Sequence, residues 1–172
     1  SALCRSFVRV MTEETGRPVA PEEYARYWGV PGVQAFRDMG ISEEARIARG
    51  IEKWDRYFQE LQEWSPPFPG IEELLEELTR RGFVLGVVTS KNDEQLESDF
   101  RPSPIAKDLP HRVTVDDTKR HKPFPDPLLE MVKRLGAEKK ECVYIGDTVF
   151  DARCAEAAGI DFALATWGLL FP

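Results

Sequence analysis

The chain has 172 residues, of which 42% are hydrophobic and 31% charged, and its formal net charge at pH 7 is -7. A chain of this length fits one ordinary domain, or a core with a small accessory lobe. The acidic balance argues against a basic surface that binds nucleic acid, although a local positive pocket could still hold a small anion.

Neither the cysteines nor the apolar segments indicate an exported or membrane protein. Cys4, Cys142 and Cys154 are an odd number without metal-ligand spacing, which favours a reducing compartment over a disulfide framework. No apolar run reaches the roughly 18 residues of a membrane-spanning helix, and no signal-peptide pattern opens the chain. We therefore expect a soluble, cytoplasmic protein without a membrane or nucleic-acid partner.

The first third of the chain carries helical patterns and no convincing strand. Apolar residues recur at helical spacing up to Gly16, over residues 21–28 and 31–39, and along a long stripe from Ile47 to Leu61. The segment Ser65-Pro66-Pro67-Phe68-Pro69-Gly70 cannot continue a helix and marks a boundary. This pattern predicts a helical lobe over residues 1–66 and a second domain over residues 67–172.

Beyond that boundary, helices alternate with short apolar strands. Such alternation implies right-handed crossovers and a largely parallel sheet. We therefore predict an α/β fold with a Rossmann-like three-layer core. The expected helices span residues 71–82, a short segment around 96–100, 128–136 and 151–158, and the expected strands span 83–88, 111–115, 142–145 and 162–165.

Two carboxylates follow the expected strand at residues 142–145. Asp147 stands at the carboxyl end of this strand, and Asp151 stands in the first turn of the next helix. Open α/β sheets bind ligands at this edge, and carboxylate oxygens at such a spacing suit Mg²⁺. The alternative is that Asp147 merely caps the helix while Asp151 favours its N-terminus through the helix dipole.

Two further strand ends carry groups suited to phosphate chemistry. Thr89 and Ser90 directly follow the strand at residues 83–88, where hydroxyl and backbone N–H groups could bind one anion, unless they only cap the next helix. In Lys122-Pro123-Phe124-Pro125 two prolines fix the chain that leaves Lys122, so its ammonium could be aimed at the strand ends, although it could be an ordinary surface lysine. Lys122 and Mg²⁺ would together offset the charge of a phosphoryl group that Thr89 orients.

These three segments, in this order, resemble the second, third and fourth motifs of the haloacid dehalogenase superfamily of hydrolases. The resemblance is closest to the phosphoglycolate-phosphatase-like branch, and it covers nearly the whole chain, including the junction at residues 67–71 and the pair Asp116-Asp117. It implies a Mg²⁺-dependent phosphatase that forms an aspartyl-phosphate intermediate. The helical lobe is similar to the family's small cap, whose closure would exclude bulk water.

The resemblance also implies roles for individual residues. Thr89 and the Ser90 backbone would bind the phosphoryl group, and Lys122 would neutralise its charge and fix the nucleophile. Asp147 would ligate Mg²⁺, and Asp151 would complete the metal shell or orient Lys122. The implied partner is a small phosphorylated metabolite, with phosphoglycolate first, while pyrophosphate, nucleoside monophosphates and sugar phosphates remain open. Arg26, Trp28 and Arg37 of the cap could face that substrate or serve packing, and the oligomeric state cannot be read from the sequence.

One departure from the family is serious. Its first motif, an Asp-x-Asp that supplies the nucleophile, occurs nowhere in the 172 residues. Ser1-Ala2-Leu3 looks like the residues that follow this motif, and the end at Pro172 looks cut short, so we expect a fragment. Losing a nucleophile costs on the order of 10⁶ in rate, so we expect negligible turnover from this chain alone.

Three other readings compete with a phosphatase. A non-catalytic relic could bind phosphate or Mg²⁺ through the remaining motifs. A receiver-type signalling domain also places threonine, lysine and acids at strand ends, but it has no helical lobe and no Lys-Pro-x-Pro loop. A dinucleotide-binding domain is weaker still, because no Gly-x-Gly-x-x-Gly follows any expected strand.

Overall fold

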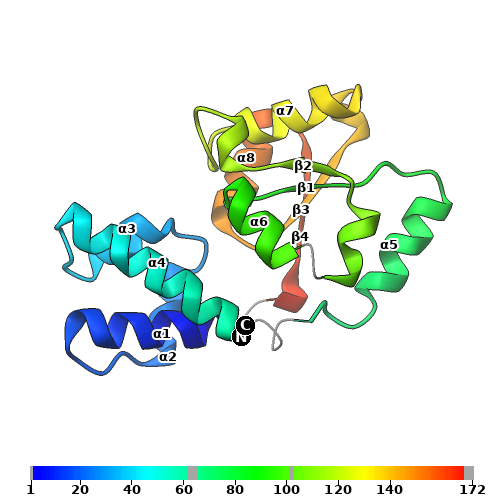
Figure 1. The fold of residues 1–172 in the computed structure, drawn as a ribbon. Helices are drawn as coiled ribbons and strands as arrows, with labels where there is room; N and C mark the ends of the chain where they lie inside the picture. The colour runs from blue at the N-terminus through cyan, green and yellow to red at the C-terminus, as the bar shows by residue number, and fades with distance from the viewer. Residues whose placement is uncertain (1, 62–65, 101–102, 169–172) are drawn as a thin grey trace. The chain divides into compact units, whose positions relative to one another are not determined.

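A computed structural model describes residues 2–61, 66–100 and 103–168 of the chain. They form two compact units, the first of which ends at Pro66 and the second of which begins at Pro67 (Figure 1). Residues 1, 62–65, 101–102 and 169–172 lie outside the described residues. They include Ser65 of the proline-rich boundary segment and both ends of the chain, where we expected truncation. Each unit is described by itself below.

The first unit is helical and packs around aromatic side chains. Phe7 of α1 is fully buried and its ring lies 5.4 Å from that of Trp54 on α4. Gly50 lets the Phe36 ring lie directly against α4, because a Cβ at this position would be 2.1 Å from the ring. The elements of this unit are α1 (Ala2–Thr15), α2 (Pro21–Tyr24), the 3₁₀ turn η1 (Ala25–Tyr27), α3 (Gly32–Asp38) and α4 (Glu44–Glu60).

The second unit alternates helices with four short strands, as the apolar pattern predicts. Every pairing among these strands is parallel, and the predicted α/β class is confirmed. Its helices are α5 (Ile71–Arg80), α6 (Asp93–Phe100), α7 (Asp126–Leu135) and α8 (Val149–Ala158), and its strands are β1 (Gly86–Val88), β2 (His111–Val113), β3 (Val143–Gly146) and β4 (Asp161–Leu164). Its 3₁₀ turns are η3 (Pro104–Asp108), η4 (Val115–Asp117), η5 (Lys139–Glu141) and η6 (Thr166–Gly168).

The strands of the second unit pair in two groups rather than in one continuous sheet. β1 pairs with β2, with Gly86 opposite His111, and β3 pairs with β4, with Val143 opposite Asp161. One core holds the groups together: α7 and α8 supply buried side chains that pack against partly buried residues of β1, β3 and β4. The buried members are Leu128, Cys154, Ala155, Ala158 and Ile160, and Val88, Tyr144 and Phe162 are among those packed against them.

Two of the expected strands are less buried than their apolar sequences predict. Residues 83–88 were expected to form a strand covered on both faces, but β1 begins only at Gly86, and Phe83 and Val84 are 60% and 63% exposed. On β3, Val143 and Ile145 are also exposed. Successive side chains of a strand point to opposite faces, and the core covers the face of β3 that carries Tyr144, so Val143 and Ile145 lie on the other face.

Candidate phosphate site

The turn from β3 into α8 builds a carboxylate site from its own backbone and side chains. Thr148 is the N-cap of α8: its hydroxyl accepts a hydrogen bond from the Asp151 amide at 3.1 Å, and its own amide donates to Asp151 Oδ2 at 3.0 Å. This capping box turns the Asp151 side chain back over the end of β3. Gly146 leaves the space for it, since a Cβ there would lie 2.6 Å from the Asp151 Cβ.

Lys122 lies against this carboxylate and is shielded from solvent. Its Nζ is 2.7 Å from Asp151 Oδ1, and the two side chains are only 13% and 4% exposed. Tyr144 of β3 joins the pair: its hydroxyl donates to Asp151 Oδ1 at 2.8 Å and accepts from Lys122 Nζ at 3.3 Å. The lysine is therefore not an ordinary surface lysine, and its ammonium is fixed at the mouth of the strands.

All of the Asp151 oxygens have protein partners. Oδ1 accepts from Lys122 and Tyr144, and Oδ2 accepts from the Thr148 amide and, at 2.6 Å, from the Thr148 hydroxyl. A carboxylate offers about four lone-pair sites, so these four donors saturate it. The arrangement fits a residue that orients Lys122 better than one that binds a metal directly.

The electrostatics of the cluster keep Asp151 ionised. Burial by itself raises the pKa of Asp151, but the charge of Lys122 and the hydrogen bonds from Lys122, Thr148 and Tyr144 outweigh it and lower this pKa below its ordinary value. Burial and the negative charge of Asp151 raise the pKa of Tyr144. Tyr144 therefore stays a neutral hydroxyl that can donate its proton to the carboxylate.

The loop after β1 approaches the same cluster. The Tyr144 hydroxyl lies 3.4 Å from the backbone oxygen of Val88, the last residue of β1, so Thr89 follows directly beside the lysine pair. The Thr89 hydroxyl accepts from the Lys91 amide at 3.2 Å, while Ser90 is exposed next to it. Neither residue caps α6, because Asn92 takes that place and accepts from the Gln95 amide at 2.8 Å.

Asp147 lies between the end of β3 and the N-cap of α8, so it follows the strand as expected but does not cap the helix. Mg²⁺ binds through one or two carboxylates completed by water and phosphate oxygens, which a single strand-end aspartate can begin to supply. Within residues 2–61, 66–100 and 103–168 there is no group of three His, Cys, Asp or Glu side chains placed to hold a metal.

Sequence reasoning missed Tyr144, which contacts Lys122, Asp151 and the end of β1. A signal was present, because a tyrosine hydroxyl in an otherwise apolar strand needs a buried partner. Of the three cap residues whose role the sequence left open, Arg37 and Trp28 have local partners. Arg37 binds Glu44 at 2.6 Å, and the Trp28 ring stands edge-on against Tyr24.

Parallel strands, helices packed over their core and a buried lysine at the strand ends define a Rossmann-like α/β protein. The model of the haloacid dehalogenase-like hydrolase family matches residues 1–165, and the chain belongs to this family. The predicted membership in this superfamily, with a phosphoglycolate-phosphatase-like branch, is thereby confirmed.

Two relatives are named as phosphatases, and they match different fractions of this chain. Phosphoglycolate phosphatase of Escherichia coli (strain K12) is 33% identical over 132 residues, which are 76% of this chain and 52% of that protein. PpaX, a candidate pyrophosphatase of Caldanaerobacter subterraneus, is 27% identical over 98% of this chain and 76% of its own length. The chain thus spans about half of the first and three quarters of the second.

Solved structures support the same fold. The crystal structure of a candidate phosphoglycolate phosphatase from Lactobacillus plantarum matches with a TM-score of 0.84 and 29% identity, over 96% of this chain and 80% of that one. None of the described helices is both long and apolar enough to cross a bilayer.

Proposed function

We propose that this chain belongs to a Mg²⁺-dependent phosphatase that hydrolyses a small phosphorylated metabolite, with phosphoglycolate as the first candidate. One observation carries the proposal: Lys122 is buried against Asp151 at 2.7 Å, beside the strand end that leads into Thr89. A desolvated, fixed ammonium next to a hydroxyl loop suits a phosphoryl group, because electrostatic stabilisation of transferring phosphoryl oxygens is strongest where water is excluded.

Each side chain has a distinct part in this proposal. Lys122 offsets charge on the phosphoryl oxygens, and Thr89, together with the Ser90 amide, donates hydrogen bonds to them. Asp151 holds Lys122 in place, with Tyr144 as a second anchor. Mg²⁺ held by Asp147, with Asp151 close by, would supply further charge neutralisation when bound. The first unit would act as a cap that excludes water and contacts the leaving group.

The nucleophile is proposed to come from a strand outside these 172 residues, since they contain no Asp-x-Asp. Two features support this part. In the part of the chain that the structure describes, β1 and β3 each have one pairing partner, and the Tyr144 side chain of β3 reaches the end of β1. The contact brings the ends of β1 and β3 near each other, and a further strand could pair with both of their remaining edges.

The experiment compares this chain with a version that carries the residues preceding Ser1 in its gene. Phosphate release from phosphoglycolate, pyrophosphate, a nucleoside monophosphate and a sugar phosphate is measured with Mg²⁺ and with EDTA. We expect turnover only in the longer version with Mg²⁺, and its loss on Lys122→Ala. A longer version that carries Asp-x-Asp yet hydrolyses none of the esters would overturn the phosphatase proposal. Turnover by the mass-verified 172-residue chain would overturn the external nucleophile.

A further inference from the structure

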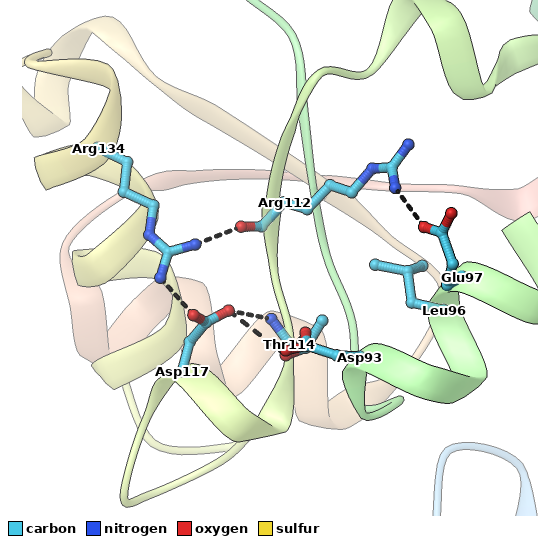
Figure 2. A pocket seen from close by; sticks show the side chains of 7 residues that line it. All are labelled: Asp93, Leu96, Glu97, Arg112, Thr114, Asp117 and Arg134. Carbon is cyan, nitrogen blue, oxygen red and sulfur yellow. Dashed lines mark hydrogen bonds and ion pairs between the residues drawn. The ribbon is translucent and has the colours of Figure 1, made fainter. Parts of the chain in front are cut away.

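Beside the free edge of β2 lies a group of polar side chains that the lysine site does not use. Thr114 follows β2 and is only 2% exposed, although it carries a hydroxyl. It lines a cavity of about 430 Å³ whose wall is mostly charged, with Leu96 as its one apolar member among the described lining residues. Figure 2 shows Thr114 between Asp93 and Asp117 at one end of this cavity. Hydrogen bonds rather than apolar packing therefore fix this corner of the unit.

Each polar atom of Thr114 has a partner. Its hydroxyl donates to Asp93 Oδ1 at 2.7 Å and accepts from the Asp116 amide at 3.3 Å. Its backbone amide donates to Asp117 Oδ2 at 2.8 Å in a capping box that closes η4. A buried hydroxyl satisfied in this way is costly to remove, because the partners left behind have no water to replace it.

The partners of Thr114 connect η4 with the loop that follows β1. Asp93 is the first residue of α6 and stands four positions after Thr89, and its amide donates to Asp116 Oδ2 at 2.9 Å. The Val115 amide donates to the Lys91 oxygen at 3.1 Å. The loop from Thr89 to Asp93 is thus held from outside, at Lys91 and at Asp93, by the segment that follows β2.

Arg134 of α7 closes the network on its other side. Its guanidinium pairs with Asp117 and donates to the Arg112 oxygen at 2.6 Å (Figure 2). The Arg112 oxygen faces away from β1, because bonding directions alternate along a parallel strand and Val113 already bonds to the Thr89 amide. Since α7 begins four residues after Lys122, one chain of contacts links the helix behind the lysine loop to the loop that carries Thr89.

We propose that Thr114 is a positioning residue: with Asp117 and Arg134 it holds the 89–93 loop in the conformation that presents Thr89 and Ser90 to phosphate. The effect of this loop conformation on phosphate binding rests on the proposed function. Thr114 touches no substrate in this scheme, and it acts through Asp93 and the Val115 amide. Local bonds also shape the loop, since the Thr89 hydroxyl accepts from the Lys91 amide and Asn92 caps α6 together with Gln95. The contacts from the segment after β2 are the anchors that reach the loop from outside.

The test uses the 172-residue chain and the variants Thr114→Val, Thr114→Ser and Thr79→Val. Valine keeps the shape but removes the hydroxyl, serine restores the hydroxyl, and Thr79 is an exposed threonine on α5 that serves as the matched control. Amide hydrogen exchange is followed residue by residue, and inorganic phosphate is titrated in the presence of Mg²⁺. In Thr114→Val we expect exchange at Asp93 and Val115 to rise about tenfold, and phosphate affinity to fall by about the same factor.

The rescue and the pattern of exchange separate positioning from general packing. Thr114→Ser should restore both readouts, Thr79→Val should leave both unchanged, and exchange at Ala155 of α8 should stay at its original rate. A uniform rise across the second unit, or unchanged exchange at Asp93 in a folded Thr114→Val, would overturn the proposal.

A second variant covers the case in which Thr114→Val does not fold. Arg134→Met removes the contact from α7, and we expect faster exchange at the Thr114 amide, which donates to Asp117. An unchanged exchange rate at the Thr114 amide in Arg134→Met would contradict the proposed link to α7. If the unmodified chain binds no phosphate while Thr114→Val still loosens the loop, the link from the loop to phosphate binding fails and the positioning of the loop stands. The proposed function is tested separately, by phosphate release from the longer version.

Discussion

The buried pair of Lys122 and Asp151 gives the sharpest test of the site, because it can be measured without turnover. Asp151→Asn keeps the size of the side chain but removes its charge and replaces one acceptor oxygen with a donor. The Lys122 ammonium, 13% exposed, then loses a carboxylate at 2.7 Å. Removing one partner of a buried pair typically costs about 3–5 kcal/mol, and we expect a loss in this range for the second unit.

A double-mutant cycle separates the pair from its surroundings. Lys122→Met removes the cation and leaves a carboxylate with Tyr144 and Thr148 as its remaining donors. The double variant leaves no charge unpaired, so its loss should be smaller than the sum of the two single losses by about 2 kcal/mol. Unfolding in urea is followed by NMR signals of α8 and β3, since two units need not unfold together. The work is done without Mg²⁺, so that no metal contributes.

The outcome that would refute this reasoning is additivity. If the two single losses sum to the loss of the double variant within about 0.5 kcal/mol, the ammonium and the carboxylate do not depend on each other. Other groups would then hold the lysine in place. The proposal that Asp151 orients Lys122 would fail, although the two groups lie 2.7 Å apart.

Four further results are expected. Folding lowers the pKa of Asp151, so its ionised form stabilises the folded state fully above the unfolded pKa of about 3.9, and this contribution is lost as pH falls through the lower folded pKa. In Asp151→Asn, the free energy of unfolding in urea should therefore depend less on pH in that acidic range. Gly146→Ala should cost about 1–3 kcal/mol in the second unit, measured by the same unfolding signals, because the new methyl meets the Asp151 side chain. Gly50→Ala should destabilise the first unit through the Phe36 ring, and an unchanged midpoint there would contradict the contact. Tyr144→Phe should cost about 1–2 kcal/mol in urea, and no loss would mean that its hydroxyl bonds are dispensable.

Periodicity predicted the helices well because each carries an apolar stripe and an ending signal. Gly136 and Gly159 stand in the left-handed conformation directly after α7 and α8, where glycine is the favoured residue. The strands were harder, because an apolar run does not state which neighbour will pair with it. Phe83 and Val84 are residue types typical of buried strands, and yet both are exposed. Whether a strand is buried depends on neighbouring strands and helices that are distant in the sequence.

The parts of the site that follow one another in the chain could be predicted, and the contacts between distant segments could not. The capping box that holds Asp151 lies within four residues, so its elements can be recognised by spacing. The contact of Tyr144 with Val88 joins positions 56 residues apart, and no local pattern encodes it. The Thr114 network has the same character, because its hydroxyl meets Asp93 across 21 residues.

The two carboxylates of the last motif are therefore not equivalent. Spacing alone treats Asp147 and Asp151 as a pair, and either could be the first ligand of Mg²⁺. In the structure, however, the four acceptor sites of Asp151 already receive Lys122, Tyr144 and two groups of Thr148. A metal could reach Asp151 only by displacing one of these donors, and losing Lys122 would cost the charge that phosphate needs. We therefore propose different roles for the two carboxylates: Asp147 binds the metal, and Asp151 orients Lys122.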